Sequence, residues 1–211
     1  MSELRVKLKQ AQTFSSRFQF LIRFYKEGLI LDVGNIGGAY GKRKSHSNYL
    51  KFKKHLSNTS ALYGFDLYHP PCESSHLYPF QTRGNLEQGL PYKTASFDTL
   101  YAGQVLEHIS DPHCVLREFN RILKKGGVLI LGVPNPYRIK RIARWIFKRE
   151  ETFGDPTHLL LYTPLSFKAL LLWFDFKILC LTTDRKLGTI WPFKKAGLGA
   201  HILCCAVENK E

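Results

Sequence analysis

The sequence predicts an α/β protein built on a doubly wound sheet, and three observations lead to this fold class. Short apolar runs alternate with amphipathic stretches along most of the chain, the pattern of strands joined by crossover helices. The first apolar run, residues 29–33, opens into a turn with several glycines, as parallel strands do where a ligand approaches the backbone. The 211 residues, 44% of them hydrophobic, suffice to bury the core of a single domain, residues 1–211.

The strands are expected where apolar residues form short runs bounded by turn residues. In chain order these runs are 29–33, 61–66, 78–82, 97–102, 128–133, 176–182 and 201–207. Helices are expected where apolar residues recur at helical spacing. These stretches are one or two basic helices within 4–26, a crossover helix within 41–57, a helix from Asp111-Pro112 to the stop at Lys125-Gly126-Gly127, and helices over 137–149 and 163–172.

The net charge of +14 is concentrated at the two ends of the chain. Residues 1–56 carry +9, residues 57–136 carry −1 and residues 137–211 carry +6. A basic N-terminal extension over 1–27 and a basic insertion over 137–162 therefore flank a neutral middle. Such charge attracts nucleic acid, phospholipid head groups or a phosphorylated substrate, although a merely solvated basic surface remains the alternative.

Compartment and metal content are predicted from what the sequence lacks. No apolar run is long enough for a membrane span, and the first ten residues lack the apolar core of a signal peptide. The five cysteines form no Cys-x-x-Cys pair, which argues against structural zinc and a disulfide framework. We therefore expect a cytoplasmic protein with no metal site.

The stretch from Leu29 to Gly41 carries the first functional signal. An apolar strand ends at Asp32-Val33, and closely spaced glycines follow. Glycine permits positive φ and removes the Cβ that would block a ligand. Asp66 then ends the second expected strand. A carboxylate there can accept hydrogen bonds from both hydroxyls of a ribose, or it can simply cap a turn.

Taken in order, these motifs resemble those of a class I S-adenosylmethionine-dependent methyltransferase, and more narrowly the methyltransferase type 11 group. The resemblance covers about residues 28–183. The motifs that carry it are Asp32-Val-Gly34, Asp66, Gly84-Asn-Leu-Glu87, Leu90-Pro91, Phe97-Asp98, Tyr101–His108, Asp111-Pro112, Leu116–Gly127, Val133–Pro136, Gly154–His158 and Tyr162–Pro164.

The resemblance implies a Rossmann-like sheet of seven strands with an antiparallel last strand and helices on both faces. It also implies S-adenosyl-L-methionine as cofactor. It places Asp32 and Gly34 by the methionine part of the cofactor, and Gly38 closes the turn. Asp66 holds the ribose, Asn85 and Leu86 lie by the adenine, and Gln104 lies at the reactive side. Asn35 and Leu67 are the further residues expected to bind the cofactor. Ile36 stands where the group has its middle glycine, and Asn85 replaces the commoner aspartate.

Methyl transfer from a sulfonium needs positioning and removal of one proton from the acceptor. His108, just after the fourth expected strand, and His158, in Asp155-Pro-Thr-His158, are the candidate catalytic bases, because an imidazole titrates near neutral pH. For each, packing against a neighbouring helix is the alternative role. His113 lies on a helix and is expected at the surface.

The sequence favours an enzyme that methylates a small molecule or a glycan or glycolipid acceptor, at oxygen. The runs around Pro134-Asn-Pro136 and Gly154–His158 are similar to those of methyltransferases of polysaccharide and glycolipid synthesis. The basic helix over 137–149 could also contact an anionic membrane. Two alternatives stay open: an RNA-modifying methyltransferase, suggested by the basic ends, and a non-catalytic scaffold relative, suggested by Ile36.

Overall fold

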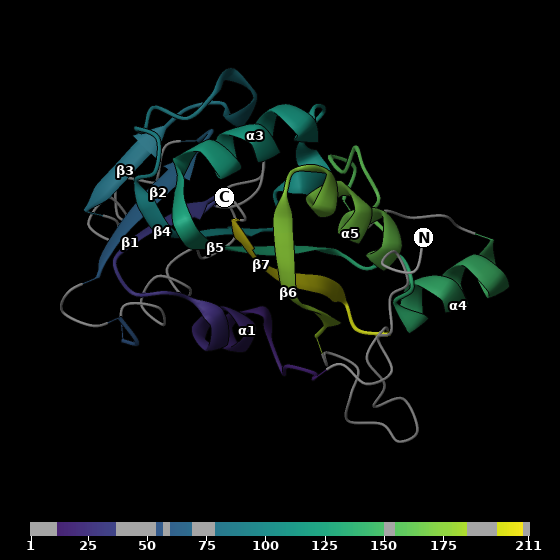
Figure 1. The fold of residues 1–211 in the computed structure, drawn as a ribbon. Coiled ribbons are helices and arrows are strands. Elements are labelled where there is room, and N and C mark those ends of the chain that lie inside the picture. The colour runs from purple at the N-terminus through teal and green to yellow at the C-terminus, as the bar shows by residue number, and fades with distance from the viewer. Residues whose placement is uncertain are drawn as a thin grey trace.

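The computed structural model describes residues 12–36, 54–56, 60–68, 79–149, 155–184 and 198–208 (Figure 1). Its centre is one sheet with the strand order β3-β2-β1-β4-β5-β7-β6. The strands are β1 (Leu29–Val33), β2 (Ala61–Asp66), β3 (Phe80–Arg83), β4 (Phe97–Gly103), β5 (Leu123–Pro134), β6 (Phe176–Thr183) and β7 (His201–Glu208).

The sheet has the mixed topology that the sequence predicts. Strands β1 to β5 pair in parallel, whereas β7 runs antiparallel between β5 and β6. The seven-stranded Rossmann-like fold with an antiparallel last strand is therefore confirmed. Because the chain leaves β1 in one direction along the sheet and returns through β4 in the other, the carboxyl ends of these strands meet at a switch point, where such sheets bind ligands.

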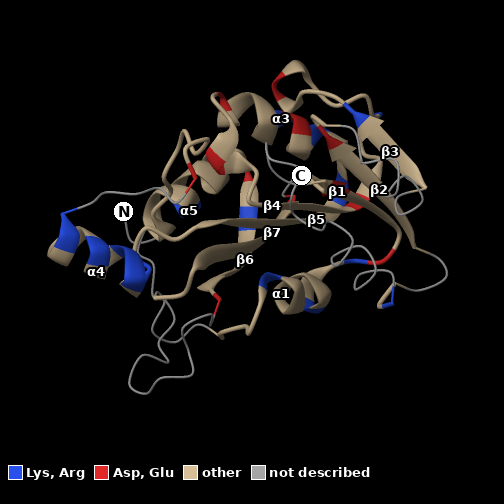
Figure 2. Cartoon of the chain, turned by 180° about the vertical axis from the view of Figure 1, so that it is seen from behind, with Lys and Arg blue, Asp and Glu red and all other residues tan. Residues whose placement is uncertain are grey.

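Helices lie on both faces of the sheet, and the two views agree on their sides (Figures 1 and 2). Residues alternate between the faces along each strand, so Ile30 joins one apolar cluster and Leu31 the other. Beyond the strands the described elements are α1 (Arg17–Phe24), η4 (Leu86–Gln88), η5 (Leu106–His108), α3 (Pro112–Ile122), α4 (Ile139–Lys148) and α5 (Pro164–Trp173).

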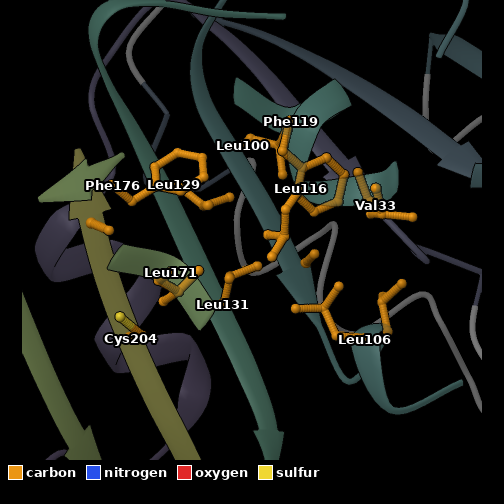
Figure 3. Packing of buried hydrophobic residues seen from close by; sticks show 14 of the residues in the cluster. Val33, Leu100, Leu106, Leu116, Phe119, Leu129, Leu131, Leu171, Phe176 and Cys204 are labelled. Atoms are coloured by element: carbon orange, nitrogen blue, oxygen red, sulfur yellow. The ribbon is translucent and has the colours of Figure 1, made fainter. Parts of the chain in front are cut away.

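The larger cluster fills the space between the sheet, α3 and α5 (Figure 3). Leu116 and Phe119 of α3 and Leu171 of α5 meet strand residues such as Leu100 and Leu129 there, and all five are inaccessible to solvent. Each side chain of this size contributes about 1.5–3 kcal/mol by burial. This layer holds η5 and the ends of β1 and β4 in place.

The smaller cluster lies on the opposite face, under α1. Phe20 and Leu21 of α1 and the preceding Phe14 are buried against strand residues such as Ile130 and Cys205. This helix is the described part of the basic helical stretch expected over residues 4–26. It packs on β5 and β7 and so belongs to the core of the fold.

One expected boundary is wrong. The sequence places the end of the helix at Lys125-Gly126-Gly127, but α3 ends at Ile122 and β5 begins at Leu123. The reason is pairing with β4: Leu123 lies opposite Phe97, and the register then shifts at a bulge. Lys124 in the bulge forms a 2.7 Å ion pair with Asp98, which a continued helix would not allow.

The remaining boundaries lie within about two residues of those expected. Most of the expected crossover stretch, residues 41–57, lies outside the described residues, as do residues 1–11. Among the described helices none is long and apolar enough to cross a membrane.

Candidate active site

The described residues among those assigned to the cofactor lie at the carboxyl ends of β1, β2, β3 and β4. Backbone hydrogen bonds tie the strand ends together: Gly34 donates to the Phe65 carbonyl at 2.8 Å, and Gly84 donates to the Asp66 carbonyl at 3.0 Å. On the other side, Gln104 donates to the Gly132 carbonyl at 2.7 Å. The structure therefore brings together segments that lie up to 70 positions apart in the sequence.

Gly34 is a position that only glycine fills without strain. Its φ is +70°, and a Cβ added there would lie 2.5 Å from Cγ2 of Val105. The turn after β1 therefore packs directly against the segment after β4. Gly38, the other glycine assigned to this turn, lies outside the described residues.

Asp66 is buried and binds the glycine turn. Its Oδ2 accepts from the backbone N–H of Ile36 at 2.9 Å, and its Oδ1 accepts from that of Tyr68 at 3.0 Å. The turn-capping alternative is therefore observed. A carboxylate offers about four acceptor sites, so turn capping and ribose binding are not mutually exclusive roles for such a group. Leu67, next to it, is half exposed.

Asn35 is held by a partner that the sequence does not indicate. Its Nδ2 donates to Gln81 Oε1 at 2.7 Å, and Gln81 Nε2 donates back to Asn35 Oδ1 at 3.2 Å. A side chain at Gly64 would collide with both amides, so a glycine in the middle of β2 makes room for the pair. The pair fixes the turn after β1 to β3.

Asp32 lies buried at the end of β1, in register with Tyr101 of β4. Burial raises the pKa of Tyr101 to about 12, with the positive charge of Arg17 opposing this shift and the negative charge of Asp32 adding to it. At neutral pH Tyr101 is therefore a neutral hydroxyl beside the carboxylate of Asp32.

The two residues assigned to the adenine follow β3 directly. Asn85 caps η4, since its Oδ1 accepts from the Glu87 backbone N–H at 3.0 Å, and Leu86 packs in the larger core cluster. Glu87 in turn accepts hydrogen bonds from Ser110 and from the backbone of Asp111. The position of Asn85 is thus coupled to the start of α3.

Gln104 has two features typical of a ligand-binding position. It is a non-glycine residue at φ +68°, a strained conformation that persists where the surroundings impose it. Its side-chain Nε2 is buried and has no hydrogen-bond partner among the described residues. Buried donors normally have a hydrogen-bond acceptor, so a ligand oxygen is expected near this Nε2. The carboxylate and hydroxyl oxygens of S-adenosylmethionine are acceptors of this kind. The residues present therefore fit the expected cofactor.

The structure joins the two candidate bases. The rings of His108 and His158 pack edge to face with centroids 4.8 Å apart. The backbone carbonyl of Glu107 accepts from the N–H groups of Leu159 and Leu160, at 2.7 and 3.1 Å, which anchors the segment carrying His158 to η5. His113, in contrast, is exposed on α3, as expected.

Hydrogen bonds determine which nitrogen of His108 carries the proton. Its Nδ1 lies 3.1 Å from the Thr157 carbonyl and 3.0 Å from Thr157 Oγ1. Thr157 Oγ1 donates its own hydrogen to Asp155 Oδ1 at 2.6 Å, so both partners of Nδ1 act as acceptors. The proton of a neutral His108 therefore sits on Nδ1, and Nε2 presents its lone pair.

Asp155 supports this arrangement electrostatically. The hydrogen bonds from the Thr157 side chain and backbone hold its pKa below the usual range, and the charges of His158 and His108 act in the same direction. The ionised carboxylate of Asp155 thus contributes a negative charge close to the two imidazoles. Asp155 and Thr157 thus position and polarise His108.

Glu107 completes the cluster. Its side chain is inaccessible to solvent, and neither carboxylate oxygen has a hydrogen-bond partner among the described residues. Burial raises the pKa of Glu107 to about 8. The sequence analysis assigned no role to Glu107, Asp155 or Thr157. All three could have been found there, because they belong to the motifs around His108 and His158.

A second polar group lies along the same edge, beyond β5. Asn135 is fully buried after β5; its Nδ2 donates to the Gly199 carbonyl at 2.8 Å, and its Oδ1 accepts from the Tyr137 N–H at 3.0 Å. Nearby, Asp184 at the end of β6 binds His201 at the start of β7, with Oδ2 and Nδ1 2.6 Å apart. These bonds fix the direction in which the chain leaves β5 toward α4.

Comparison with solved structures defines the class of the fold. The chain superposes on an S-adenosylmethionine-dependent methyltransferase from Thermotoga maritima with a TM-score of 0.64 and 21% identity, covering 92% of this chain and 88% of that one. It superposes on the methyltransferase in complex with the Trm112 methyltransferase activator of Haloferax volcanii with a TM-score of 0.63 and 17% identity, covering 90% and 87%. At these identities the likeness concerns the fold.

Sequence comparison adds evidence on the family of the chain. Residues 45–131 match the sequence model of a family described as Methyltransferase domain. Over 51 residues the chain is 45% identical to 27-O-demethylrifamycin SV methyltransferase of Amycolatopsis mediterranei strain S699. That match spans 22% of this chain and about a fifth (19%) of the relative. A segment of the chain thus matches a methyltransferase domain, and the chain has the fold of solved S-adenosylmethionine-dependent methyltransferases. Both findings agree with the predicted class, whose cofactor is S-adenosylmethionine.

Proposed function

We propose that this protein transfers the methyl group of S-adenosylmethionine to a hydroxyl oxygen of a small-molecule, glycan or glycolipid acceptor. The observation that carries the proposal is His108, whose ring Thr157 orients and whose Nε2 has no hydrogen-bond partner among the described residues. It lies just after the strand end that presents Gln104. An imidazole with a free lone pair at this edge suits the removal of a hydroxyl proton.

The cofactor would be held by the groups at the strand ends. Gly34 allows its close approach, Asp66 would accept from the ribose hydroxyls, and the unpartnered Nε2 of Gln104 would donate to an oxygen of the cofactor. When bound, the cofactor supplies a methyl carbon activated by a sulfonium. The side chain of Ile36 does not prevent its own N–H from binding Asp66, so this position keeps a backbone hydrogen bond without the middle glycine.

The protein's chemical task is the proton. Methyl transfer to a hydroxyl oxygen would release one proton, and the electron pair of the broken carbon–sulfur bond would leave with the sulfur of the cofactor. His108 Nε2 takes the proton of the hydroxyl, and the resulting imidazolium is stabilised by ionised Asp155. Such a base contributes about 10²–10⁴-fold to the rate.

Oxygen as the acceptor atom has independent support in the name of the curated relative, which specifies a 27-O position.

A glycolipid acceptor is supported by α4. None of its residues is buried, and Trp145, Ile146 and Phe147 expose 60%, 55% and 84% of their surface. The expected apolar stripe therefore does not pack onto the domain in this half of the helix.

Lys and Arg accompany these apolar residues along α4, which is blue over much of its length in Figure 2. The six basic residues are Arg138, Lys140, Arg141, Arg144, Lys148 and Arg149. Exposed aromatic and basic side chains together are typical of helices at anionic membrane surfaces. We include peripheral binding to an anionic bilayer in the proposal, since a lipid-linked acceptor would be found there.

The test is a screen with cofactor labelled on the methyl group, offered to soluble hydroxylated compounds, glycans, lipid-linked glycans and tRNA. Labelling of a hydroxylated acceptor that His108→Gln abolishes would support the proposal. Labelling of tRNA alone would favour RNA modification, the alternative that the basic ends of the chain suggest. Cofactor binding without transfer to any acceptor would favour a non-catalytic scaffold.

A further inference from the structure

We propose that Glu107, His108 and His158 bind one divalent transition-metal cation. The three side chains offer one carboxylate oxygen and two imidazole nitrogens, and these atoms lie within 4.8 Å of one another. The inference departs from the expectation of no metal site drawn from the sequence, where His158 lies 50 positions after His108. The binding of a cation does not depend on the proposed function, but its role in the reaction does, because that role needs a hydroxyl as methyl acceptor.

The buried polar group of the site lacks a partner. Glu107 is fully buried, and its two side-chain oxygens have no hydrogen-bond partner among the described residues. Buried polar groups of this kind are costly unless they are hydrogen-bonded, paired or coordinated to a metal. A bound cation would coordinate an oxygen that no described residue contacts by a hydrogen bond.

His108 also has the second partner that metal-binding histidines commonly have. A ligating imidazole usually donates its other N–H to a carbonyl or carboxylate, which fixes the ring and its tautomer. His108 Nδ1 does so toward the Thr157 carbonyl at 3.1 Å, so its Nε2 is available as ligand. The bond from Thr157 Oγ1 to Asp155 extends this support by one more group.

The spacing can close around a cation. Bonds of about 2.0–2.2 Å place neighbouring ligands of a tetrahedral site roughly 3.4 Å apart, so the widest pair must approach by a little over 1 Å. His158 is half-buried in a segment without helix or strand, which the Glu107 carbonyl anchors through Leu159 and Leu160. A shift of this size lies within what rotation of the ligating side chains can supply.

The donor set indicates the class of cation. Two imidazoles and one carboxylate suit Zn²⁺, Co²⁺, Fe²⁺ or Mn²⁺ better than Ca²⁺ or Mg²⁺, which prefer oxygen ligands. Three protein ligands leave a position open, as in catalytic sites. An acceptor hydroxyl bound there would be more acidic and release its proton to solvent, and its oxygen would then attack the methyl carbon as described above. In that case His108 acts as a ligand and not as the base.

The experiment measures binding without acceptor or cofactor. The full chain is stripped with chelator, desalted, and titrated with Co²⁺ while the absorption of its d–d bands is followed; Zn²⁺ is then used to displace it. We expect one saturable site per chain, and at least a tenfold weaker Kd in Glu107→Gln and in His158→Gln. His113→Gln, which alters an exposed histidine outside the cluster, should bind as the unmodified chain does.

Circular dichroism of each variant shows whether it is folded. If Glu107→Gln does not fold, His158→Gln still tests the site, because His158 is less buried than Glu107. Absence of saturable binding by the unmodified chain up to about 1 mM cation would overturn the inference. Binding unchanged in His158→Gln would do the same, because the cation would then lie elsewhere. Methylation by the stripped chain at the full rate would exclude a catalytic cation and leave the proposed function standing.

Discussion

His108 and His158 meet edge to face, with their ring planes at 70°, although they belong to segments on either side of β5 and α4. The contact makes one cluster of two residues that are separate candidates in the sequence. Thr157 orients one ring, and the backbone of Glu107 anchors the segment of the other. Substitutions in this cluster should therefore affect turnover more than cofactor affinity.

The first prediction concerns His108. His108→Gln should lower kcat by about 10²–10⁴-fold, because a proton acceptor or metal ligand is lost at the reacting oxygen. The Kd for S-adenosylmethionine, measured by calorimetry, should stay nearly unchanged. His113→Gln serves as the matched control. Unchanged turnover in His108→Gln would leave this residue with a packing role only.

The second prediction concerns Asp66. Asp66→Ala should weaken cofactor binding by roughly 1–3 kcal/mol, because a charged hydrogen-bond acceptor is removed and the Ile36 N–H loses its partner. Calorimetry on the folded variant gives the value. Asp175→Asn, an exposed aspartate at positive φ where asparagine is tolerated, is the control. Normal affinity of Asp66→Ala would show that the ribose is held elsewhere.

The third prediction compares two glycines with nearly the same backbone. Gly34 and Gly126 have φ of +70° and +68°, but only at Gly34 would a Cβ meet another atom, Cγ2 of Val105. Gly126→Ala should cost about 1–2 kcal/mol of unfolding free energy from backbone strain alone. Gly34→Ala should cost clearly more, and Val105→Ala in the same chain should recover part of the difference. Equal losses at both sites in denaturant unfolding would contradict the close packing of Gly34 on Val105.

The fourth prediction concerns pH. Burial alone would raise the pKa of Asp184, but the hydrogen bonds from His201 and its charge together hold this pKa below its usual value of 3.8. A carboxyl with a lowered folded pKa stabilises the protein above its unfolded pKa, and that stability is lost as the pH falls through the folded pKa. Asp184→Asn should therefore be less stable than the unmodified chain by about 2–4 kcal/mol at pH 6.

The difference between Asp184→Asn and the unmodified chain should shrink below pH 4, as the carboxyl is protonated. Denaturant unfolding at a series of pH values measures it, with Asp175→Asn as a matched carboxyl outside the pair. A difference that stays constant down to pH 3 would show that the charge of Asp184 contributes no stability.

The fifth prediction concerns α4. Vesicles with anionic lipid should co-sediment the protein at low salt, because each basic residue near such a surface contributes about 1 kcal/mol. Changing Lys140, Arg144 and Lys148 to Gln should reduce this binding, since all three are exposed. The control removes the same charge elsewhere, at the exposed residues Arg117, Lys125 and Lys177. Equal loss in both variants would indicate a net-charge effect, and equal binding to neutral vesicles would contradict an electrostatic membrane contact.

The local signals in the sequence determine most of the fold. The limits of β1 and β2 are those of the runs 29–33 and 61–66, because a strand of a parallel sheet that is covered on both faces is mostly apolar and each run is bounded by turn residues. The positions of Gly34 and Asp66 follow in the same way, since each depends on the strand that it ends. Strand order and the antiparallel β7 were predictable through the family resemblance and not through any local pattern.

Only the tertiary structure decided the features that depend on residues distant in sequence. Pairing of Leu123 with Phe97 ends α3 earlier than the glycines suggest. Gln81 holds Asn35, and Thr157 determines the tautomer of His108. In each case the partner lies 26 to 49 positions away, and hydrogen-bond geometry between such residues is set by how the strands pair and the loops cross. The motifs in the sequence identify His108 and His158 as candidate site residues. Only the fold places them next to each other and next to Glu107.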